Sequence, residues 1–215
     1  MRRSGRTFLI CGALALFCLS VTARAQDASD THGVKPSELT REAILNDPET
    51  PVGGNPKGDV TIVAFEDYNC PYCKKSEPAL QKLIRVDGHI RLVYKDWPIL
   101  SKTSVYAAII ALGAKYQGKY EVLHRAFMQI RGHADNAMID RAVHESGVDI
   151  ARLNKDLAAH SAEIHAIIRR NNAQALGMGF QGTPVFLVGP YLVAAALDYN
   201  GFRKVVAQAR EGEGK

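Results

Sequence analysis

The sequence predicts an α/β fold in which a long helical insertion separates two parts of one sheet. A strand, a helix and a second strand follow one another over residues 60–96. The apolar spacing is then helical over residues 101–177, and a hairpin pattern and a last helix occupy residues 185–210. A hydrophobic content of 47% and a mean hydropathy of −0.12 are typical of a soluble globular protein.

Residues 1–25 have the pattern of a cleaved signal peptide. Three arginines within residues 2–6 precede an apolar run over residues 8–21, and Ala23-Arg24-Ala25 supplies the small residues of a cleavage site. We expect the mature chain to begin at Gln26 and to be exported to the periplasm, which is an oxidising compartment. An uncleaved membrane anchor is the alternative, although the apolar run is short for a membrane-spanning helix.

The charge of the mature chain is close to zero. The leader holds four of the 27 Lys and Arg residues and none of the 22 Asp and Glu residues, so its removal leaves 23 basic against 22 acidic side chains. A net charge of +1 gives no basis for binding nucleic acid or an anionic membrane surface.

The first half of the mature chain predicts a parallel strand-helix-strand unit. Residues 26–50 form a polar N-terminal segment with a short helix at 38–45, and the Gly- and Pro-rich residues 51–58 form a loop. The β-branched run at 60–65 predicts a strand buried on both faces. A helix after residue 70 and a second strand at 90–94 complete the unit, whose strands should be parallel.

The second half predicts helices and then a return to the sheet. Five amphipathic helices fit residues 101–177, two of them N-capped by Asp135 and Asp149. A hairpin turns at Gly189-Pro190, and Asp198 caps the last helix. The α/β domain therefore spans residues 51–210, and we expect the polar residues 211–215 to be a disordered tail.

The mature chain keeps only two of the four cysteines, Cys70 and Cys73, because Cys11 and Cys18 belong to the leader. The pair lies where a strand passes into a helix. The unpaired N–H groups and the dipole at a helix start favour a thiolate, so Cys70 is the predicted nucleophile. Pro71 and Tyr72 would tune its reactivity through the available N–H groups and the access to its sulfur.

Three interpretations of the cysteine pair are open. A structural disulfide would close too small a loop to contribute much stability. A zinc site would need two more ligands, and the histidines show no paired ligand spacing. The seven histidines are His32, His89, His124, His133, His144, His160 and His165. A redox dithiol needs no further residue and no cofactor or metal, and we favour it.

The combined motifs resemble the thioredoxin superfamily, and within it the DsbA-like branch near the ScsC-type periplasmic oxidoreductases. The resemblance rests on residues 65–73 with Cys-Pro-Tyr-Cys, on Asp96-Trp97-Pro98-Ile99-Leu100, and on Gly182-Thr183-Pro184. It covers residues 48–210. It implies a thioredoxin fold whose helical insertion lies between the strand-helix-strand unit and the C-terminal hairpin and helix.

The resemblance also implies two features of the site. Thr183-Pro184 would be a cis peptide bond facing the dithiol, where residue 183 would pair with an extended substrate peptide. Relatives typically carry an acid where this chain has Ala64. Glu66 lies two positions further along the same strand face, so we hypothesise that it accepts a proton from Cys73. A solvated carboxylate at the strand end is the alternative for Glu66.

The expected function is thiol-disulfide exchange with exported proteins through a Cys70/Cys73 dithiol-disulfide cycle, as an enzyme that acts as a disulfide oxidase. A disulfide isomerase or reductase of the ScsC type is the first alternative. A periplasmic Cu(I)-binding protein that uses the same two thiolates is the second. We expect a monomer, because residues 26–50 lack the heptads of an assembly stalk, and an inner-membrane redox partner that recycles the dithiol.

Overall fold

The computed structural model describes residues 34–213, so the predicted leader, with Cys11 and Cys18, lies outside the described part of the chain. Its elements, in chain order, are η1 (Pro36–Leu39), α1 (Arg41–Leu45), β1 (Val52–Gly54), β2 (Val60–Glu66), α2 (Pro71–Asp87), β3 (Ile90–Asp96), α3 (Lys102–Ala114), η2 (Lys115–Gln117), α4 (Tyr120–Gln129), α5 (Asn136–Glu145), α6 (Ile150–Ala159), α7 (Ser161–Gly177), β4 (Val185–Val188), β5 (Tyr191–Val193) and α8 (Tyr199–Glu213). Among the described helices, none has the length and apolarity needed to cross a membrane.

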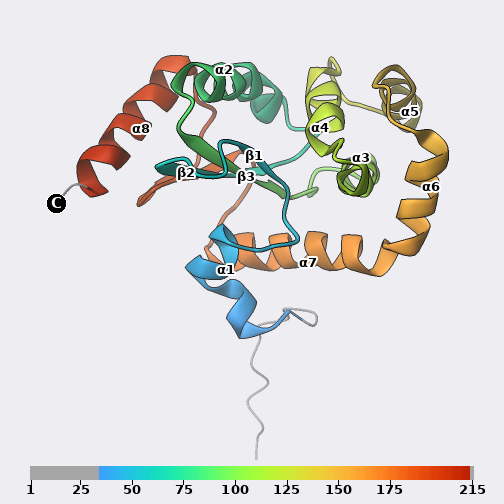
Figure 1. Cartoon of the computed structure of the whole chain (residues 1–215), viewed down its shortest axis with the longest axis horizontal. Helices are drawn as coiled ribbons and strands as arrows, with labels where there is room; N and C mark the ends of the chain where they lie inside the picture. Colours follow the sequence, from blue (N-terminus) through green and yellow to red (C-terminus); the bar gives the residue numbers. More distant parts are fainter. Residues whose placement is uncertain (1–33, 214–215) are drawn as a thin grey trace, which may run out of the picture. The chain divides into compact units, whose positions relative to one another are not determined.

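Five strands form one mixed sheet in the order β1-β3-β2-β4-β5 (Figure 1). The central pair β2 and β3 is parallel, from Val60 opposite Ile90 to Glu66 opposite Asp96, as the strand-helix-strand pattern predicts. β4 pairs antiparallel with β2, and β5 pairs antiparallel with β4 through the turn at Gly189-Pro190. The C-terminal hairpin is therefore confirmed, and it lies beside the strand that leads to the cysteine pair.

Alternate residues of β2 face two different cores, because side chains alternate across a strand. Ile62 and Ala64 belong to the core beneath α2 and α8, whereas Val63 and Phe65 belong to the smaller core against α1 and α7. Figure 1 shows these two helix layers on opposite sides of the sheet. Glu66, the last residue of β2, continues the phase of Ile62 and Ala64. It therefore points to the side on which α2 carries the cysteine pair.

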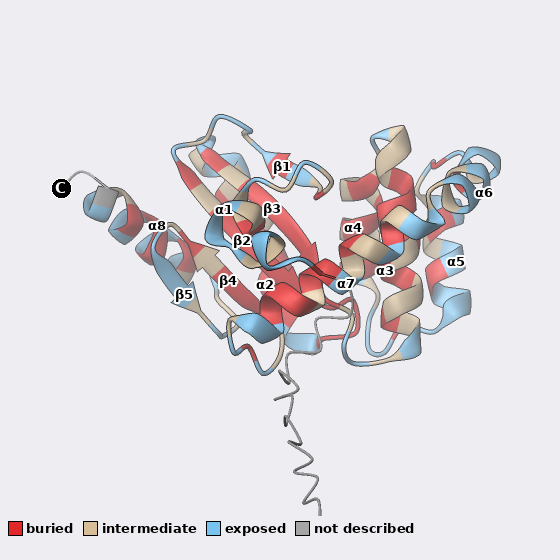
Figure 2. Cartoon of the chain, turned by 90° about the horizontal axis from the view of Figure 1, so that it is seen from below, coloured by how far each residue is buried: buried red, intermediate tan, exposed pale blue. Residues whose placement is uncertain are grey.

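The helical insertion is confirmed, with α3 to α7 between β3 and β4. Its inner side chains join the core that lies beneath α2, so the insertion and this face of the sheet bury one continuous set of apolar residues (Figure 2). Asp135 and Asp149 accept N-cap hydrogen bonds from Met138 and Arg152, as their positions predicted. Asp198 caps α8 in the same way, through the N–H of Gly201 at 2.7 Å.

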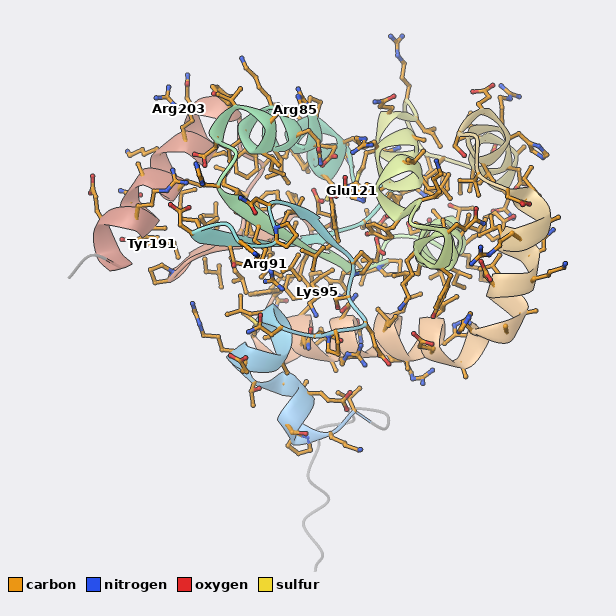
Figure 3. The ribbon with its side chains drawn as sticks, viewed as in Figure 1. Arg85, Arg91, Lys95, Glu121, Tyr191 and Arg203 are labelled. Carbon is orange, nitrogen blue, oxygen red and sulfur yellow. The ribbon has the colours of Figure 1, made fainter. Side chains whose placement is uncertain are left out.

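A buried lysine marks the other face of the sheet, and the sequence analysis did not identify it. Lys95 of β3 lies on the α7 side of the sheet (Figure 3). Its Nζ is 3.6 Å from Asp47 Oδ2, and Arg170 Nη2 of α7 is 2.7 Å from the same oxygen. Burial lowers the pKa of Lys95 to about 8, although Asp47 opposes that change. The N-terminal segment is thus tied to the sheet by charge as well as by apolar packing.

Three predicted segments differ from the structure. The helix expected at 38–45 is two short helices, because Thr40 has an extended backbone and its hydroxyl caps α1. The loop expected at 51–58 contains the edge strand β1, which pairs with β3. Gly53 lies against Glu121 and Tyr94, and a Cβ there would require the Glu121 side chain to move. Helix α8 extends to Glu213, three residues into the tail expected at 211–215.

Candidate active site

Cys70 occupies the first position before α2, where the chain leaves β2 and turns into the helix. Its backbone is extended, with φ −78° and ψ 117°, and Pro71 follows at the first helical position. The N–H of Cys73 donates to Cys70 Sγ at 3.4 Å, so the sulfur is the N-cap group of the helix. Both cysteines are free thiols in this structure.

The turn that carries Cys70 is anchored to the helical insertion. Asp67 accepts from the N–H of Asn69 at 2.7 Å and from the N–H of Leu100 at 2.9 Å. The Asn69 amide donates to Thr103 Oγ1 at 2.8 Å and accepts from the N–H of Ala134 at 2.6 Å. The position of the turn that carries Cys70 is thus set by two distant segments, near the start of α3 and before α5.

The pKa values of the two thiols are shifted in opposite directions. Hydrogen bonds from Cys73 are the largest cause that lowers the pKa of Cys70 to about 6, and the N–H groups of the helix start add to it. Cys73 is fully buried, and burial raises the pKa of its thiol far above the ordinary value. At neutral pH the first sulfur is therefore a thiolate and the second a thiol.

Thr183 and Pro184 lie beside Cys70, as the resemblance implied. Their peptide bond is cis. Cys70 Sγ lies 3.2 Å from the carbonyl oxygen of Thr183, across 113 residues of sequence, and donates a hydrogen bond to it when the sulfur is protonated. The two residues also line a cavity of about 730 Å³ with the exposed side chains of Tyr72 and Leu192. The cavity lies between the first turn of α2 and the C-terminal hairpin, and Thr183 belongs both to its wall and to the contact with Cys70.

Glu66 is buried, so the alternative that it is a solvated carboxylate is wrong. Only 4% of its surface is exposed, and burial together with the charge of Glu77 raises its pKa to about 8. Its charge in turn contributes to the raised pKa of Cys73. The hypothesis that Glu66 exchanges a proton with Cys73 stays a prediction, and its position on the inner face of β2 is compatible with it.

The sequence analysis missed two partners of Glu66. His124 Nε2 of α4 is 3.5 Å from Glu77 Oε1 of α2 and 4.0 Å from Glu66 Oε2. His124 adjoins the apolar positions Leu123 and Phe127, and a histidine on an apolar helix face was the available signal. Because these three residues come from three different elements, no spacing in the sequence relates them.

Glu66, Glu77 and His124 are the one group of described residues whose ligand atoms lie within 4.8 Å of one another and could hold a metal ion. Two carboxylates and an imidazole suit a borderline divalent ion such as Zn²⁺ rather than Cu(I).

The comparisons with known proteins agree with the geometry. A family model described as Thioredoxin matches residues 46–208. The chain belongs to the thioredoxin family. Within that family it is similar to a thioredoxin-like oxidoreductase from Silicibacter pomeroyi DSS-3, with 42% identity, a TM-score of 0.75, and coverage of 80% of this chain and 98% of the other.

Two further solved structures place this thioredoxin-family chain in the DsbA-like and ScsC-like group. The thiol-disulfide exchange protein alpha-DsbA2 from Wolbachia pipientis is 29% identical with a TM-score of 0.74, over 80% of this chain and 94% of the other. ScsC from Proteus mirabilis is 26% identical with a TM-score of 0.72, over 82% of this chain and 77% of the other. The resemblance inferred from the motifs is therefore confirmed.

Curated sequences of longer proteins match this chain over part of their length. The Na(+)/H(+) antiporter NhaA 1 from Mycobacterium sp. (strain KMS) is 25% identical over 158 residues, which cover 72% of this chain and 24% of the antiporter. This thioredoxin-family chain thus spans about a quarter of the length of the first curated relatives that it matches.

Proposed function

We propose that the protein is a periplasmic thiol-disulfide oxidoreductase that forms or exchanges disulfide bonds in exported proteins. The observation that carries this proposal is the contrast between the two thiols. Cys70 at the start of α2 has a pKa of about 6, and its partner Cys73 is buried and holds its proton. Such a pair supplies one reactive thiolate for exchange with a client and keeps the second thiol for resolution, although both side chains are buried in this structure. The leader pattern in residues 1–25 supports export.

The reaction begins from the Cys70–Cys73 disulfide. A client thiolate attacks Cys70 Sγ, a client–Cys70 bond forms, and the electron pair of the old S–S bond passes to Cys73, which takes up a proton. A second client thiolate then attacks the client sulfur of the mixed disulfide, and Cys70 leaves as a thiolate. The client has gained a disulfide, and the enzyme has gained two electrons and is a dithiol.

Stabilisation of the Cys70 thiolate favours this direction. A leaving thiolate of low pKa departs readily, and its stability makes the reduced enzyme the preferred form. We therefore propose oxidase activity first, in a monomer, with an inner-membrane redox partner that reoxidises the dithiol. Isomerase or reductase activity would use the same atoms, with the Cys70 thiolate attacking a client disulfide. Thr183 and Pro184 would align the client in both cases.

The test is oxidative refolding of a reduced protein that contains native disulfides, with a metal chelator present. Wild type should accelerate disulfide formation, and Cys70→Ser, which replaces the N-cap sulfur with a hydroxyl oxygen that can accept the same hydrogen bond, should not. Equal rates for the two proteins, or a wild-type rate that vanishes with the chelator, would refute the proposal. Equilibration with glutathione measures the redox potential of the Cys70/Cys73 pair and so distinguishes an oxidase from a reductase. The disulfide of an oxidase should already be reduced at a low glutathione concentration. Light scattering checks the monomer.

A further inference from the structure

Three buried polar side chains meet without hydrogen-bond partners: Glu66 of β2, Glu77 of α2 and His124 of α4. Each is at least 96% buried. Both oxygens of each carboxylate and Nε2 of His124 make no hydrogen bond among the described residues. Native proteins contain few buried polar atoms without a partner, because such an atom has lost its water and gained nothing in return. Five of them in one place indicate that the cluster receives a partner from outside the chain.

The spacing of these atoms is long for hydrogen bonds and close to that of ligands around one shared ion. His124 Nε2 lies 3.5 Å from Glu77 Oε1 and 4.0 Å from Glu66 Oε2. A charge-assisted N–H···O bond would be only about 2.7–2.9 Å long. Zinc–ligand bonds of about 2.0–2.2 Å at tetrahedral angles place neighbouring ligand atoms about 3.3–3.6 Å apart. One ligand atom from each residue lies within 4.8 Å of the other two, so a small shift of the carboxylates brings the set to that spacing.

A chain of hydrogen bonds orients His124 as a ligand. Asp96 accepts from the hydroxyl of Tyr120 at 3.0 Å, and Tyr68 donates toward Tyr120 Oη at 3.5 Å. The hydroxyl of Tyr68 has thus used its proton, so it accepts from His124 Nδ1 at 3.1 Å. The hydrogen stays on Nδ1, and the lone pair of Nε2 faces the two carboxylates. Metal-binding histidines are held in this way, with the second ring nitrogen donating to a neighbouring oxygen.

The charge and the atoms of the cluster select the kind of ion. The charge of Glu77 helps to raise the pKa of Glu66, so the two carboxyl groups repel each other when both are ionised. A divalent cation would balance both charges. Carboxylate oxygen and imidazole nitrogen are ordinary zinc ligands, and three protein ligands leave the fourth tetrahedral position for a water molecule. Mg²⁺ and Ca²⁺ prefer about six or more oxygen ligands, and Cu(I) prefers sulfur. The donor set therefore fits Zn²⁺ best.

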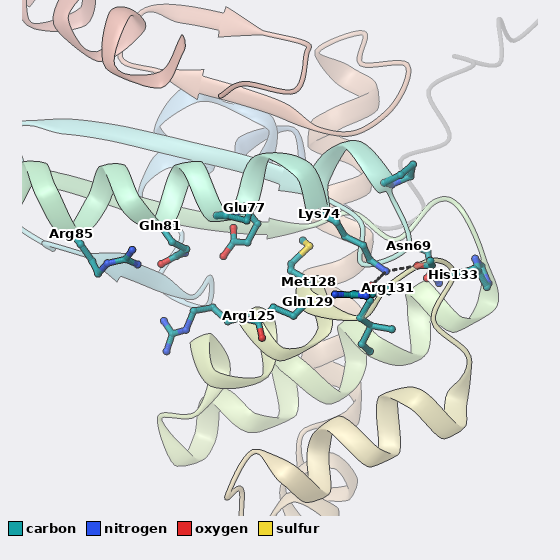
Figure 4. Close-up of a pocket in the computed structure, with 14 residues that line it drawn as sticks. Asn69, Lys74, Glu77, Gln81, Arg85, Arg125, Met128, Gln129, Arg131 and His133 are labelled. Carbon is teal, nitrogen blue, oxygen red and sulfur yellow. Dashed lines mark hydrogen bonds between the residues drawn. The ribbon is translucent and has the colours of Figure 1, made fainter. Parts of the chain in front are cut away.

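Glu77 gives an ion a route from solvent. It lines a cavity of about 870 Å³ between α2 and α4, and Figure 4 shows its side chain directed from α2 toward Met128 of α4. The cavity wall also carries four basic side chains, namely Lys74, Arg85, Arg125 and Arg131. Their charges slow the entry of a cation. Inside the cluster the attraction of the carboxylates is screened much less than in water. We therefore expect slow loading of the site and slow release from it.

We propose that Glu66, Glu77 and His124 form a buried site for one Zn²⁺ ion, with His124 Nε2 and one oxygen of each carboxylate as its ligands. The ion joins β2, α2 and α4, and so fastens the helical insertion to the sheet. None of its ligands is a cysteine, so the site is independent of the proposed thiol-disulfide exchange. The pKa values of Glu66 and His124 given above belong to the metal-free cluster, because metal ligands bind in their deprotonated forms.

The test uses chelator-treated protein in which Cys70 and Cys73 are joined as a disulfide, so that no thiolate can bind the metal. Elemental analysis after incubation with Zn²⁺ and gel filtration should find one ion per chain. His124→Gln and Glu77→Gln should each weaken Zn²⁺ binding at least about tenfold in titration calorimetry. Glu163→Gln is the matched control, because Glu163 forms an exposed carboxylate–imidazole pair with His160 at 3.3 Å. Zn²⁺ should raise the unfolding temperature of wild type and of Glu163→Gln, and not that of His124→Gln.

X-ray absorption at the zinc edge of wild type provides a measurement that does not depend on how the variants fold. The ion in the disulfide form should have only nitrogen and oxygen ligands, with the signature of one imidazole. A sulfur ligand, more than one imidazole, or less than about half an ion per chain would each overturn the site. Zn²⁺ affinities of His124→Gln and Glu77→Gln within twofold of Glu163→Gln would overturn it as well. Loss of client oxidation with this binding intact would count against the proposed function alone.

Discussion

The contribution of Cys73 to the acidity of Cys70 can be isolated with two substitutions at one position. Hydrogen bonding from Cys73 is the largest cause of the low pKa of Cys70, which is about 6. Cys73→Ala removes the side-chain donor and keeps the backbone N–H, which donates to Cys70 Sγ at 3.4 Å. Cys73→Ser keeps a hydroxyl donor in the same place. The pair therefore separates the side-chain donor from the helix start.

The magnitude follows from the strength of a hydrogen bond to a charged acceptor. Such a bond contributes about 1.5–3 kcal/mol. One pKa unit corresponds to about 1.36 kcal/mol, so loss of the bond should raise the pKa of Cys70 by about 1 to 2 units. In the Cys73→Ala variant, the Cys70 thiol should therefore titrate near pH 7 to 8, which is about 1 to 2 pH units above the wild-type pKa of about 6. Cys73→Ser should stay near wild type.

The assay is the rate of alkylation of Cys70 by iodoacetamide across the pH range, with thiolate absorbance as a second readout. Urea unfolding of both variants provides the control for folding. Identical titration curves for the serine and alanine variants would refute the role of the side-chain donor. A Cys70 pKa at the ordinary thiol value in wild type would refute the role of the helix start as well.

Three further predictions concern the framework and the pH dependence. Asn69→Ala leaves buried partners unpaired and should lower the free energy of unfolding by about 2–3 kcal/mol; a urea midpoint unchanged from wild type would contradict this. Arg210→Gln breaks the salt bridges to Asp59 and Asp87, but the Arg210 side chain is 35% exposed. The loss in free energy of unfolding should therefore stay below about 1 kcal/mol and shrink in high salt, and a loss that salt does not change would argue against a screened ion pair. Burial and the charge of Glu77 raise the pKa of Glu66 from 4.5 to about 8, so its neutral form stabilises the fold fully below pH 4.5 and this contribution is lost as the pH rises through about 8. Glu66→Gln should therefore lose less stability than wild type between about pH 4.5 and pH 8, measured by thermal unfolding in a series of buffers, and parallel curves over this range would show that Glu66 is not the responsible group.

Local patterns account for the parts of the fold that could be predicted. The β-branched run of β2, the caps Asp135, Asp149 and Asp198, and the turn at Gly189-Pro190 each act through neighbours a few residues away. Such signals survive in a single sequence. The edge strand β1 could not be predicted in this way, because its glycines have little strand propensity and its pairing depends on β3, which lies almost 40 residues further along.

The functional site likewise combines features that the sequence predicts with features that only the structure shows. The motif positions of Cys70, Cys73, Thr183 and Pro184 were visible in the sequence. That Glu66 is buried was not, because a carboxylate at a strand end is more often solvated. Burial of Glu66 results from the packing of α2 and α4 over the end of β2.

The sequence by itself determined which thiol is the more acidic, since an N-terminal thiol of a helix meets the N–H groups and dipole of its own helix, whatever else the chain does. Only the tertiary structure decided the surroundings of the Glu66 carboxylate. Its neighbours Glu77 and His124 come from α2 and α4, and the raised pKa values of Glu66 and His124 depend on mutual distance and loss of water. Both quantities exist only after the helices have packed on the sheet.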